Sequence, residues 1–285
     1  MATLRELRTR VASITNIQRV TNAMQMVAAA KMRRAQEAIE AARPYAQQLD
    51  RVLRELHQSV DTDEQPLFKE RPAERVAVVV VTADRGLCGG FNSNVCRRVQ
   101  TELGQYGDSQ IELVTVGRKG RSFFVNRDYE IAYHHADVFQ QLEFASAVNI
   151  AQDLTRSFIA GNTDRVLLVY SEFISVGSQV PTVQQLLPIV PQEGVEESSA
   201  ADYLFEPSPE ALLQTLVPRQ VNFQVWRALL ESNAGFFAAQ MTAMDNATKN
   251  AGDIIEELTR EMNKERQASI TLELMDIIGG AEAVA

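Results

Sequence analysis

The sequence is poor in cysteine and has no long apolar run. Its two cysteines, Cys88 and Cys96, are too few for a disulfide framework or a zinc site, which favours a reducing compartment. No uninterrupted apolar stretch approaches the roughly 20 residues of a membrane-spanning helix. The N-terminus also lacks the short apolar core of a secretory signal. We therefore expect a soluble cytoplasmic protein.

Aromatic residues are scarce as well, at 7% of the chain, and Trp226 is the only tryptophan. Alanine, glutamine and arginine are abundant instead, which is typical of long helices with small residues packed along them. The hydrophobic content of 45% and the charged content of 23% lie within the globular range. This composition excludes a disordered, a collagen-like or a disulfide-rich miniature protein.

Charge is unevenly distributed along the chain. The formal net charge is -9, yet residues 1–43 hold eight basic and three acidic side chains, a balance of +5 that leaves -14 for the remainder. A basic segment on an acidic protein indicates a polyanion, an acidic protein surface or a solvated helix face as its surroundings. Because its charges are spread around a helix and no aromatic residue precedes Tyr45, we favour a protein partner over nucleic acid.

The N-terminal segment has the pattern of a very long helix. Residues 4–60 contain no glycine and a single proline, Pro44, which should bend the helix or mark a joint. Apolar residues recur every three or four positions, and such a narrow stripe indicates a coiled-coil seam. The expected seam comprises Leu4, Leu7, Val11, Ile14, Ile17, Ala23 or Met24, Val27, Ala30, Ala35, Ala38, Ala42, Tyr45, Leu49, Val52, Leu56 and Val60.

The C-terminal third repeats this pattern for more than four heptads. Pro218 should separate a short helix at 209–216 from a long one at 219–278. We expect the two terminal stripes to pair as an antiparallel coiled coil, in preference to a bundle helix or a homodimer. The expected seam here comprises Leu230, Ala234, Phe237, Met241, Met244, Thr248, Ala251, Ile255, Leu258 and Met262.

The middle of the chain alternates between strand and helix patterns. The β-branched run at 75–82 is typical of a strand buried on both faces of a parallel sheet. Residues 191–210 carry acidic but no basic side chains and are typical of an acidic linker. Further strands are expected at 111–116, 129–133 and 165–170, and edge strands at 174–183 and 185–189. One helix is expected to begin with Asn92 or Ser93 as its N-cap, and two more are expected at 119–125 and 144–159.

These patterns predict an α/β fold plus a coiled coil. A small Rossmann-like α/β domain at 66–200, with the acidic linker at its end, is inserted between long terminal helices at 1–60 and 209–285.

A glycine-rich turn follows the first strand and includes Gly86, Gly89 and Gly90. Such a turn before a helix can hold phosphate on backbone N–H groups. The spacing here is G-x-x-G-G and no G-K-[ST] follows, so neither a dinucleotide fingerprint nor a P-loop is present. We favour a structural turn with close strand-to-helix approach. A nucleotide-binding α/β regulator with a coiled-coil arm stays as the alternative.

Candidate catalytic groups are few. Cys88 in the turn could serve as a thiol nucleophile, but it would need a histidine partner. His57 lies on the expected N-terminal helix, and His134 and His135 would point in opposite directions on a strand. No metal-ligand cluster or G-x-S-x-G turn is present. We therefore expect no catalytic, metal or cofactor site, with a thiol enzyme at Cys88 as a third hypothesis.

Four stretches together resemble the gamma subunit family of the rotary F-type ATP synthase. They are NIQRVTNAMQMVAAAKMRRAQ at 16–36, DRGLCGGFN at 84–92, YLFEP at 203–207 and RQASITLELMDIIGGA at 266–281. The last has the family's spacing of Thr, Glu, an acid and Gly-Ala. The resemblance covers essentially the whole chain in the family's order.

This resemblance implies a non-catalytic rotor subunit. The terminal helices would form a bent antiparallel coiled-coil shaft inside a ring of three alpha and three beta subunits. The α/β domain would form a foot beside the epsilon subunit and the ring of c subunits, peripheral to the cytoplasmic face of a bacterial inner membrane. Nucleotide chemistry would belong to the alpha and beta subunits, coupling ATP synthesis to proton transport.

The resemblance also implies partner contacts. Arg266, Gln267, Thr271 and Glu273 match positions that contact a loop of the beta subunit. Met24 and Gln25 match the stretch that passes the lower rim of the beta subunits; many relatives carry lysine at the position of Gln25. Residues 277–285 are nearly uncharged, as suits a tip in an apolar bearing. No redox-regulatory cysteine insertion of chloroplast relatives is present, so thiol control is not expected.

Overall fold

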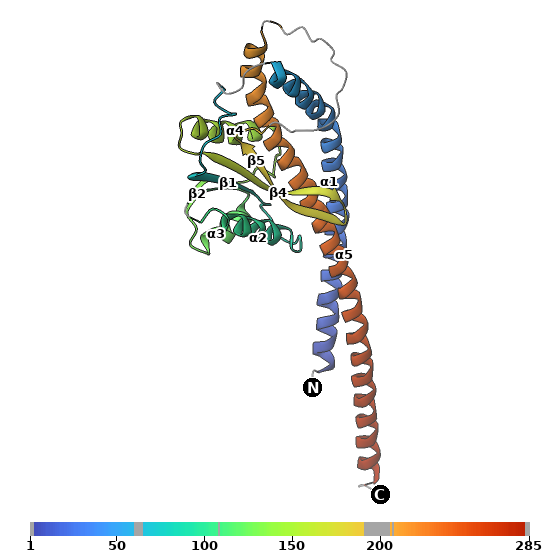
Figure 1. Cartoon of the computed structure of the whole chain (residues 1–285). Coiled ribbons are helices and arrows are strands. Elements are labelled where there is room, and N and C mark those ends of the chain that lie inside the picture. Colours follow the sequence, from blue (N-terminus) through green and yellow to red (C-terminus); the bar gives the residue numbers. More distant parts are fainter. Residues whose placement is uncertain (1–2, 60–64, 108, 191–205, 207, 283–285) are drawn as a thin grey trace. The chain divides into compact units, whose positions relative to one another are not determined.

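Two long helices lie at the ends of the chain, with a five-stranded sheet and three further helices between them in sequence (Figure 1). The computed structural model describes residues 3–59, 65–107, 109–190, 206 and 208–282, and the side chains of these except 57–59 and 279–282. In chain order the elements are α1 (Leu4–Ser59), β1 (Arg75–Val81), α2 (Phe91–Leu103), β2 (Gln110–Val116), α3 (Arg118–Val125), β3 (Ile131–His135), α4 (Phe144–Ile159), β4 (Arg165–Ser175), β5 (Ser178–Leu187) and α5 (Pro209–Glu282). This arrangement confirms the predicted fold class.

The chain divides into two compact units. The terminal unit combines residues 1–29 with residues 240–285, and the central unit comprises residues 30–239. The acidic linker expected at 191–210 lies almost entirely outside the described residues, as does most of the YLFEP stretch.

The sheet of the central unit has the strand order β3-β2-β1-β4-β5. β1 pairs in parallel with β2 and β4, β3 is parallel to β2, and β5 is antiparallel to β4. Residues of β1 alternate between the two faces, as the period of a strand requires. Val76, Val78 and Val80 belong to one apolar cluster, whereas Ala77 and Val79 belong to the other.

Each face of the sheet is covered by helices. One cluster joins the face of Val76 to α2 and α3 through residues such as Val95 and Phe124. The other joins the face of Ala77 to α4 and to parts of α1 and α5, with Phe158 and Leu229 fully buried in it. Burial on both faces accounts for the near-continuous apolar character of β1.

An ion pair anchors the start of β1 to the loop before β4. The Asp164 carboxylate is 3% exposed and accepts hydrogen bonds from the backbone N–H of Arg75 (3.0 Å) and from its guanidinium (2.9 and 3.2 Å). Burial alone would raise the pKa of Asp164, but the hydrogen bonds from Arg75 outweigh it and lower the pKa below its usual value.

Replacing this carboxylate should destabilise the central unit in a pH-dependent way. We expect Asp164→Ala to lower the free energy of unfolding by about 2 kcal/mol at neutral pH, because charge-assisted hydrogen bonds are lost. The stabilisation from a lowered pKa is present above the unfolded-state value of about 4 and disappears as the pH falls through the native value. Urea unfolding at several pH values should show the difference from wild type shrinking in acid; a constant difference would contradict the assignment.

Several local predictions were wrong, each for an identifiable reason. Pro218 lies inside α5 and does not separate two helices; it is exposed, while Val217 and Val221 beside it are buried. Proline lacks the backbone N–H of a helical hydrogen bond, but because Pro218 faces solvent, this loss leaves the packing of Val217 and Val221 intact. Pro44 lies inside α1, so it marks no joint between two helices, while the bend of α1 that was predicted as the other outcome stays a prediction. Burial of one face therefore outweighs both prolines.

The edge of the sheet also differs from expectation. The two predicted edge strands at 174–183 and 185–189 are replaced by one hairpin, in which β4 extends to Ser175 and β5 begins at Ser178. α2 begins at Phe91 after Gly90, and no side chain caps it. The expected cap Asn92 instead accepts a hydrogen bond from the Ala83 N–H at 2.9 Å.

Candidate functional site

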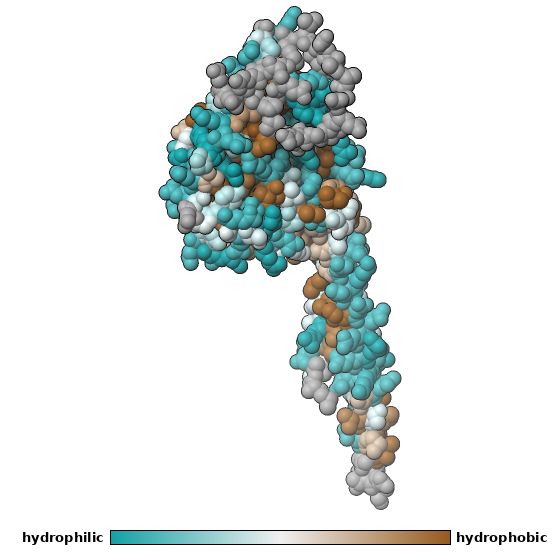
Figure 2. All heavy atoms as spheres, in the orientation of Figure 1, coloured by the Kyte–Doolittle hydropathy of each residue, from teal (hydrophilic) through white to brown (hydrophobic). Residues whose placement is uncertain are grey.

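The C-terminal part of α5 exposes its side chains all around the helix. Every residue from Arg266 to Ile278 is exposed. The large apolar side chains in this stretch are 50 to 68% exposed, and apolar residues appear at the surface near this end of α5 in Figure 2. These exposed apolar residues are Ile270, Leu272, Leu274, Met275, Ile277 and Ile278. Large exposed apolar patches mark interaction sites, so this segment is the first candidate contact surface.

The four residues predicted to contact a beta-subunit loop all lie on this segment. Arg266 and Glu273 are seven positions apart and share one face, and Gln267 and Thr271 share the neighbouring one. The Thr271 hydroxyl donates to the Gln267 carbonyl at 2.9 Å, a bond within the helix. Their charged and amide ends are thus presented outward.

A second apolar surface lies on α1 within the terminal unit. Ile17, Val20, Met26 and Val27 are 51 to 62% exposed. The prediction that Ile17 and Val27 belong to the seam was therefore wrong. Hydropathy alone selects apolar residues for the seam. In the structure, hydrogen-bonded polar residues occupy part of the seam instead.

The buried stripe of α1 in the terminal unit follows a strict seven-residue repeat. Leu7, Ile14, Thr21 and Ala28 form one row of buried or half-buried side chains. A second row consists of Leu4, Val11, Gln18 and Gln25. Three polar side chains thus occupy seam positions of a coiled coil.

These polar residues are satisfied by α5, which runs antiparallel to α1 in this unit. The Gln18 amide donates to the Thr248 carbonyl at 3.5 Å, and the Thr248 hydroxyl donates to the Thr21 hydroxyl oxygen at 2.8 Å. The Gln25 amide donates to a carboxylate oxygen of Asp245 at 3.0 Å. We call these five residues the polar seam.

The surroundings of Gln25 explain how an amide fits at this position. Asp245 also accepts a hydrogen bond from Lys249 at 2.6 Å, and that bond is the main cause of its lowered pKa. The carboxylate therefore already has a cationic partner on α5. Met24 is half-buried beside Gln25. Of the two residues predicted at the lower rim, Gln25 thus forms its hydrogen bond within the chain, to Asp245.

The glycine-rich turn packs against α5 within the central unit. Cys88 and Phe91 form an apolar cluster with Ala83 and Phe236, and the Phe91 and Phe236 rings are 6.0 Å apart. Gly235 permits this approach, because a Cβ there would lie 3.1 Å from the Phe91 ring. The turn therefore joins the α/β fold to the C-terminal helix.

The close approach expected at the turn's glycines lies elsewhere. Gly89 has φ +55° but open space around it, while Gly86 and Gly90 have only side-chain neighbours. A Cβ at Gly117 would lie 2.0 Å from the Thr82 carbonyl oxygen, and one at Gly120 would lie 2.8 Å from the Thr82 hydroxyl. The segment after β2 thus makes the tight contact.

The backbone N–H groups at the carboxyl end of the sheet are partly occupied. One Asp84 oxygen accepts hydrogen bonds from the N–H groups of Arg118 (3.1 Å) and Asp137 (3.2 Å). The Arg118 guanidinium in turn pairs with the Asp137 carboxylate. A carboxylate already stands where a phosphate would accept these bonds, which disfavours a nucleotide at this edge.

The thiols are not arranged for nucleophilic chemistry. Cys88 is 3% exposed, and burial raises its pKa, which disfavours the reactive thiolate. Its sulfur accepts a hydrogen bond from the Asn92 amide at 3.2 Å. Burial also raises the pKa of Cys96, to about 12. His134 is bonded to the Thr115 hydroxyl on β2 at 3.0 Å.

The described part of the chain holds neither a metal-binding cluster nor a membrane-spanning helix. No group of three His, Cys, Asp or Glu residues there could hold a metal ion. None of its helices combines the length and the hydrophobicity of a membrane span.

Comparisons with known proteins identify relatives over the full length. A family model described as ATP synthase matches residues 3–284. An ATP synthase gamma chain from Chlorobaculum parvum is 46% identical over 290 residues, covering 100% of this chain and 99% of the relative. One from Pelotomaculum thermopropionicum is also 46% identical, covering 100% of both.

Solved structures give the same picture. A chain of the Tetrahymena thermophila mitochondrial ATP synthase, in a structure of its central stalk and c-ring, is 27% identical with a TM-score of 0.60; the match covers 80% of this chain and 99% of that one. A chain of the Euglena gracilis mitochondrial enzyme has a TM-score of 0.70 at 19% identity, covering 99% and 94%. The second similarity concerns the fold alone.

Proposed function

The chain belongs to the family of ATP synthase gamma chains, and from this premise we propose that it is the central-stalk rotor of a proton-translocating F-type ATP synthase. It transmits rotation of a membrane-embedded c-ring to a catalytic ring of three alpha and three beta subunits. ATP synthesis is thereby coupled to proton transport.

One observation supports this role most directly. The last turns of α5 expose apolar side chains on every face of the helix, and within the described chain nothing covers them. An isolated helix with this surface is poorly solvated. It fits a helix enclosed on all sides by partners, as an axle in a bearing is.

The physical task of such an axle is to break symmetry. Three identical beta subunits adopt different nucleotide affinities only if each meets a different surface. The terminal unit offers such surfaces: an exposed apolar row on α1 with Ile17, Val20 and Val27, and charged turns of α5 with Arg266 and Glu273. Rotation presents these faces to the three beta subunits in turn.

Particular residues are assigned to particular partners. We assign Arg266, Gln267, Thr271 and Glu273 to a beta-subunit loop, because all four are exposed on successive turns. Met24 and Gln25 are assigned to the stretch beside the lower rim of the beta subunits. Since Gln25 is bonded to Asp245, its contribution there is to hold the helix pair together.

The remaining assignments concern the foot and the location. Residues 66–200 form the foot on the c-ring and the epsilon subunit, and residues 1–60 and 209–285 form the shaft. The chain is non-catalytic and binds no nucleotide, which agrees with the Asp84 carboxylate on the amides that a phosphate would use. It is peripheral to the cytoplasmic face of a bacterial inner membrane.

Co-assembly with alpha and beta subunits tests this proposal. The full chain, produced with alpha and beta subunits of the same source, should co-purify as one soluble ATP-hydrolysing complex. Leu274→Asp should reduce co-purification, because it places a charge on the surface that partners enclose. Ile159→Asp, an equally exposed position on α4, is the matched control. Failure of the wild-type chain to join the complex would contradict the rotor assignment.

A further inference from the structure

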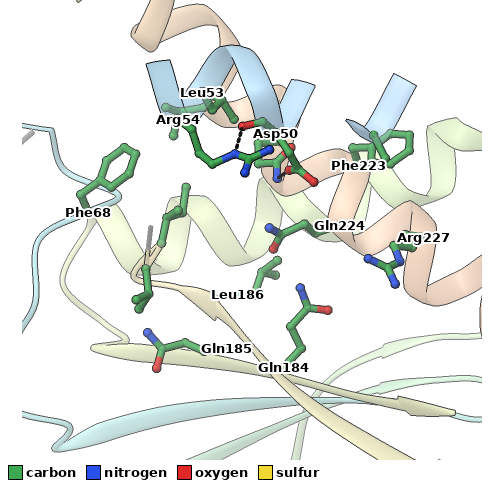
Figure 3. Close-up of a pocket in the computed structure, with 15 residues that line it drawn as sticks. Asp50, Leu53, Arg54, Phe68, Gln184, Gln185, Leu186, Phe223, Gln224 and Arg227 are labelled. Carbon is green, nitrogen blue, oxygen red and sulfur yellow. Dashed lines mark hydrogen bonds between the residues drawn. The ribbon is translucent and has the colours of Figure 1, made fainter. Parts of the chain in front are cut away.

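The central unit contains a cavity that the rotor function does not use. Its volume is about 330 Å³, and it lies between α1, β5 and α5 (Figure 3). This volume is at the lower end of the range for small-molecule sites. The cavity opens to the surface beside Arg54 and Arg227, which are exposed residues of its lining.

Eight of the fifteen lining residues are apolar, and they come from distant parts of the sequence. Leu53 of α1, Phe68 of the segment before β1, Leu186 of β5 and Phe223 of α5 all line it. Leu186 is 1% exposed and Phe223 is 7% exposed. The Phe223 ring is held by Tyr45, with 5.1 Å between the ring centres. These walls suit a flat aromatic body.

Polar groups with spare hydrogen-bonding capacity face the same space. In Figure 3 the Gln224 side chain extends from α5 and the Gln184 side chain rises from β5. Gln224 makes no side-chain hydrogen bond to any described residue, and Gln184 only accepts one from the Tyr170 hydroxyl at 3.4 Å. The amide of Gln184 thus has free donors, and that of Gln224 has both donors and an acceptor.

The charged groups of the lining define what the cavity would accept. Arg54 and Arg227 are positive and Asp50 is negative, and the carboxylate of Glu231, outside the lining, pairs with Arg227. Arg227 donates its Nε–H to Glu231 at 2.7 Å, and its terminal N–H groups have no partner among the described residues. These charges balance in number, which suits an uncharged ligand, and the terminal N–H groups of Arg227 can also donate to a singly anionic one.

We propose that this cavity is a binding site for a small aromatic molecule that is uncharged or singly anionic and carries one hydrogen-bonding group. The ring lies between the apolar walls, and the polar group contacts Gln224 and Gln184. The site is independent of the rotor role, since all its lining residues belong to the central unit. A ligand there would tie α1 and α5 to β5.

The dye N-phenyl-1-naphthylamine tests the proposal on the full-length chain. It is uncharged and aromatic, has one N–H donor and fluoresces in apolar surroundings. Trp226, the only tryptophan, lies between the lining residues Gln224 and Arg227 and serves as an energy-transfer donor. We expect saturable binding of one dye per chain, with quenching of Trp226 emission and sensitised dye emission. Absence of saturable binding would mean that the cavity holds only water, and would overturn the proposal.

One variant at Gln224, with a matched control, locates the dye. Gln224→Phe fills the cavity and should weaken binding at least about tenfold, since the ring and the dye compete for one space. Gln214→Phe changes an exposed glutamine of the same helix outside the lining and should leave affinity unchanged. Equal affinity in wild type and Gln224→Phe would place the dye elsewhere and overturn the proposal.

The near-isosteric Gln224→Leu tests the polar contact without filling the cavity. It removes no hydrogen bond to a described residue, so the fold should be retained, as circular dichroism can verify. Loss of one hydrogen bond predicts roughly three- to tenfold weaker binding of the dye. The N-methylated dye, which lacks the donor, should bind wild type and Gln224→Leu alike. Unchanged affinity of the unmethylated dye would overturn the contact assigned to Gln224.

Discussion

Removing residues 262–285 should lower proton-driven ATP synthesis by more than about tenfold, a loss of the size expected when a coupling free energy disappears. The described helix within this segment, residues 262–282, has a length of roughly 32 Å. It contains Arg266, Gln267, Thr271 and Glu273 together with the exposed apolar residues of α5. Synthesis in membrane vesicles, normalised to the amount of assembled chain, is the measurement.

Two controls separate coupling from folding. Deleting only residues 278–285 removes roughly 8 Å of described helix, residues 278–282, and none of the four assigned contact residues, so synthesis should fall only modestly. Residues 266–278 are all exposed, and of 262–265 only Met262, Asn263 and Glu265 are half-buried, so the longer deletion should lower the thermal stability of the isolated chain only slightly. An undiminished rate of ATP synthesis after the longer deletion would contradict the assigned role of this segment.

The substitution Gly117→Ala should destabilise the central unit by more than about 3 kcal/mol, among the largest effects of a single change. Two costs combine at this position. Its φ of +90° is unfavourable for any residue with a side chain. The added Cβ would also lie 2.0 Å from the Thr82 carbonyl oxygen, so the ends of β1 and β2 would have to separate.

Two other glycines serve as comparisons that separate the conformational cost from the steric cost. Gly89→Ala meets only the conformational cost, at φ +55° in open space, and should lose about 1 kcal/mol. Gly107→Ala has neither a positive φ nor a neighbour within 4 Å and should be nearly neutral. Urea unfolding gives all three values. If Gly117→Ala does not fold, its absence from the soluble fraction is the expected outcome; stability within 1 kcal/mol of wild type would contradict the geometry.

The secondary structure was predictable where burial and propensity agree. The valine-rich run of β1 and the regular pattern of α4 each indicate their elements directly. Prediction failed where packing outweighs local preference, as at Pro218, or where two patterns merge into one hairpin, as in β4 and β5. It also failed for Ile17 and Val27, because hydropathy does not register hydrogen bonds between distant helices.

The candidate site was predictable only through the family resemblance. No periodicity distinguishes Arg266 or Glu273 from other surface residues, and their exposure became evident only from the structure. The role of the glycine-rich turn as a packing point for Phe236 could not be derived, because the two segments are far apart in sequence. The same holds for the cavity, whose lining combines residues from Ala46 to Arg227.

The polar seam has a mechanical consequence. A coiled coil with a uniformly apolar seam can slide by one heptad and still bury apolar surface. Here such a slip would set Gln25 against Gly252 in place of Asp245 and would separate the Thr21 and Thr248 hydroxyls. Each broken contact costs about 1 kcal/mol. The hydrogen bonds therefore fix the register of the helix pair. Under axial load the two helices keep this register, whereas hydrophobic packing alone would allow them to slide past one another.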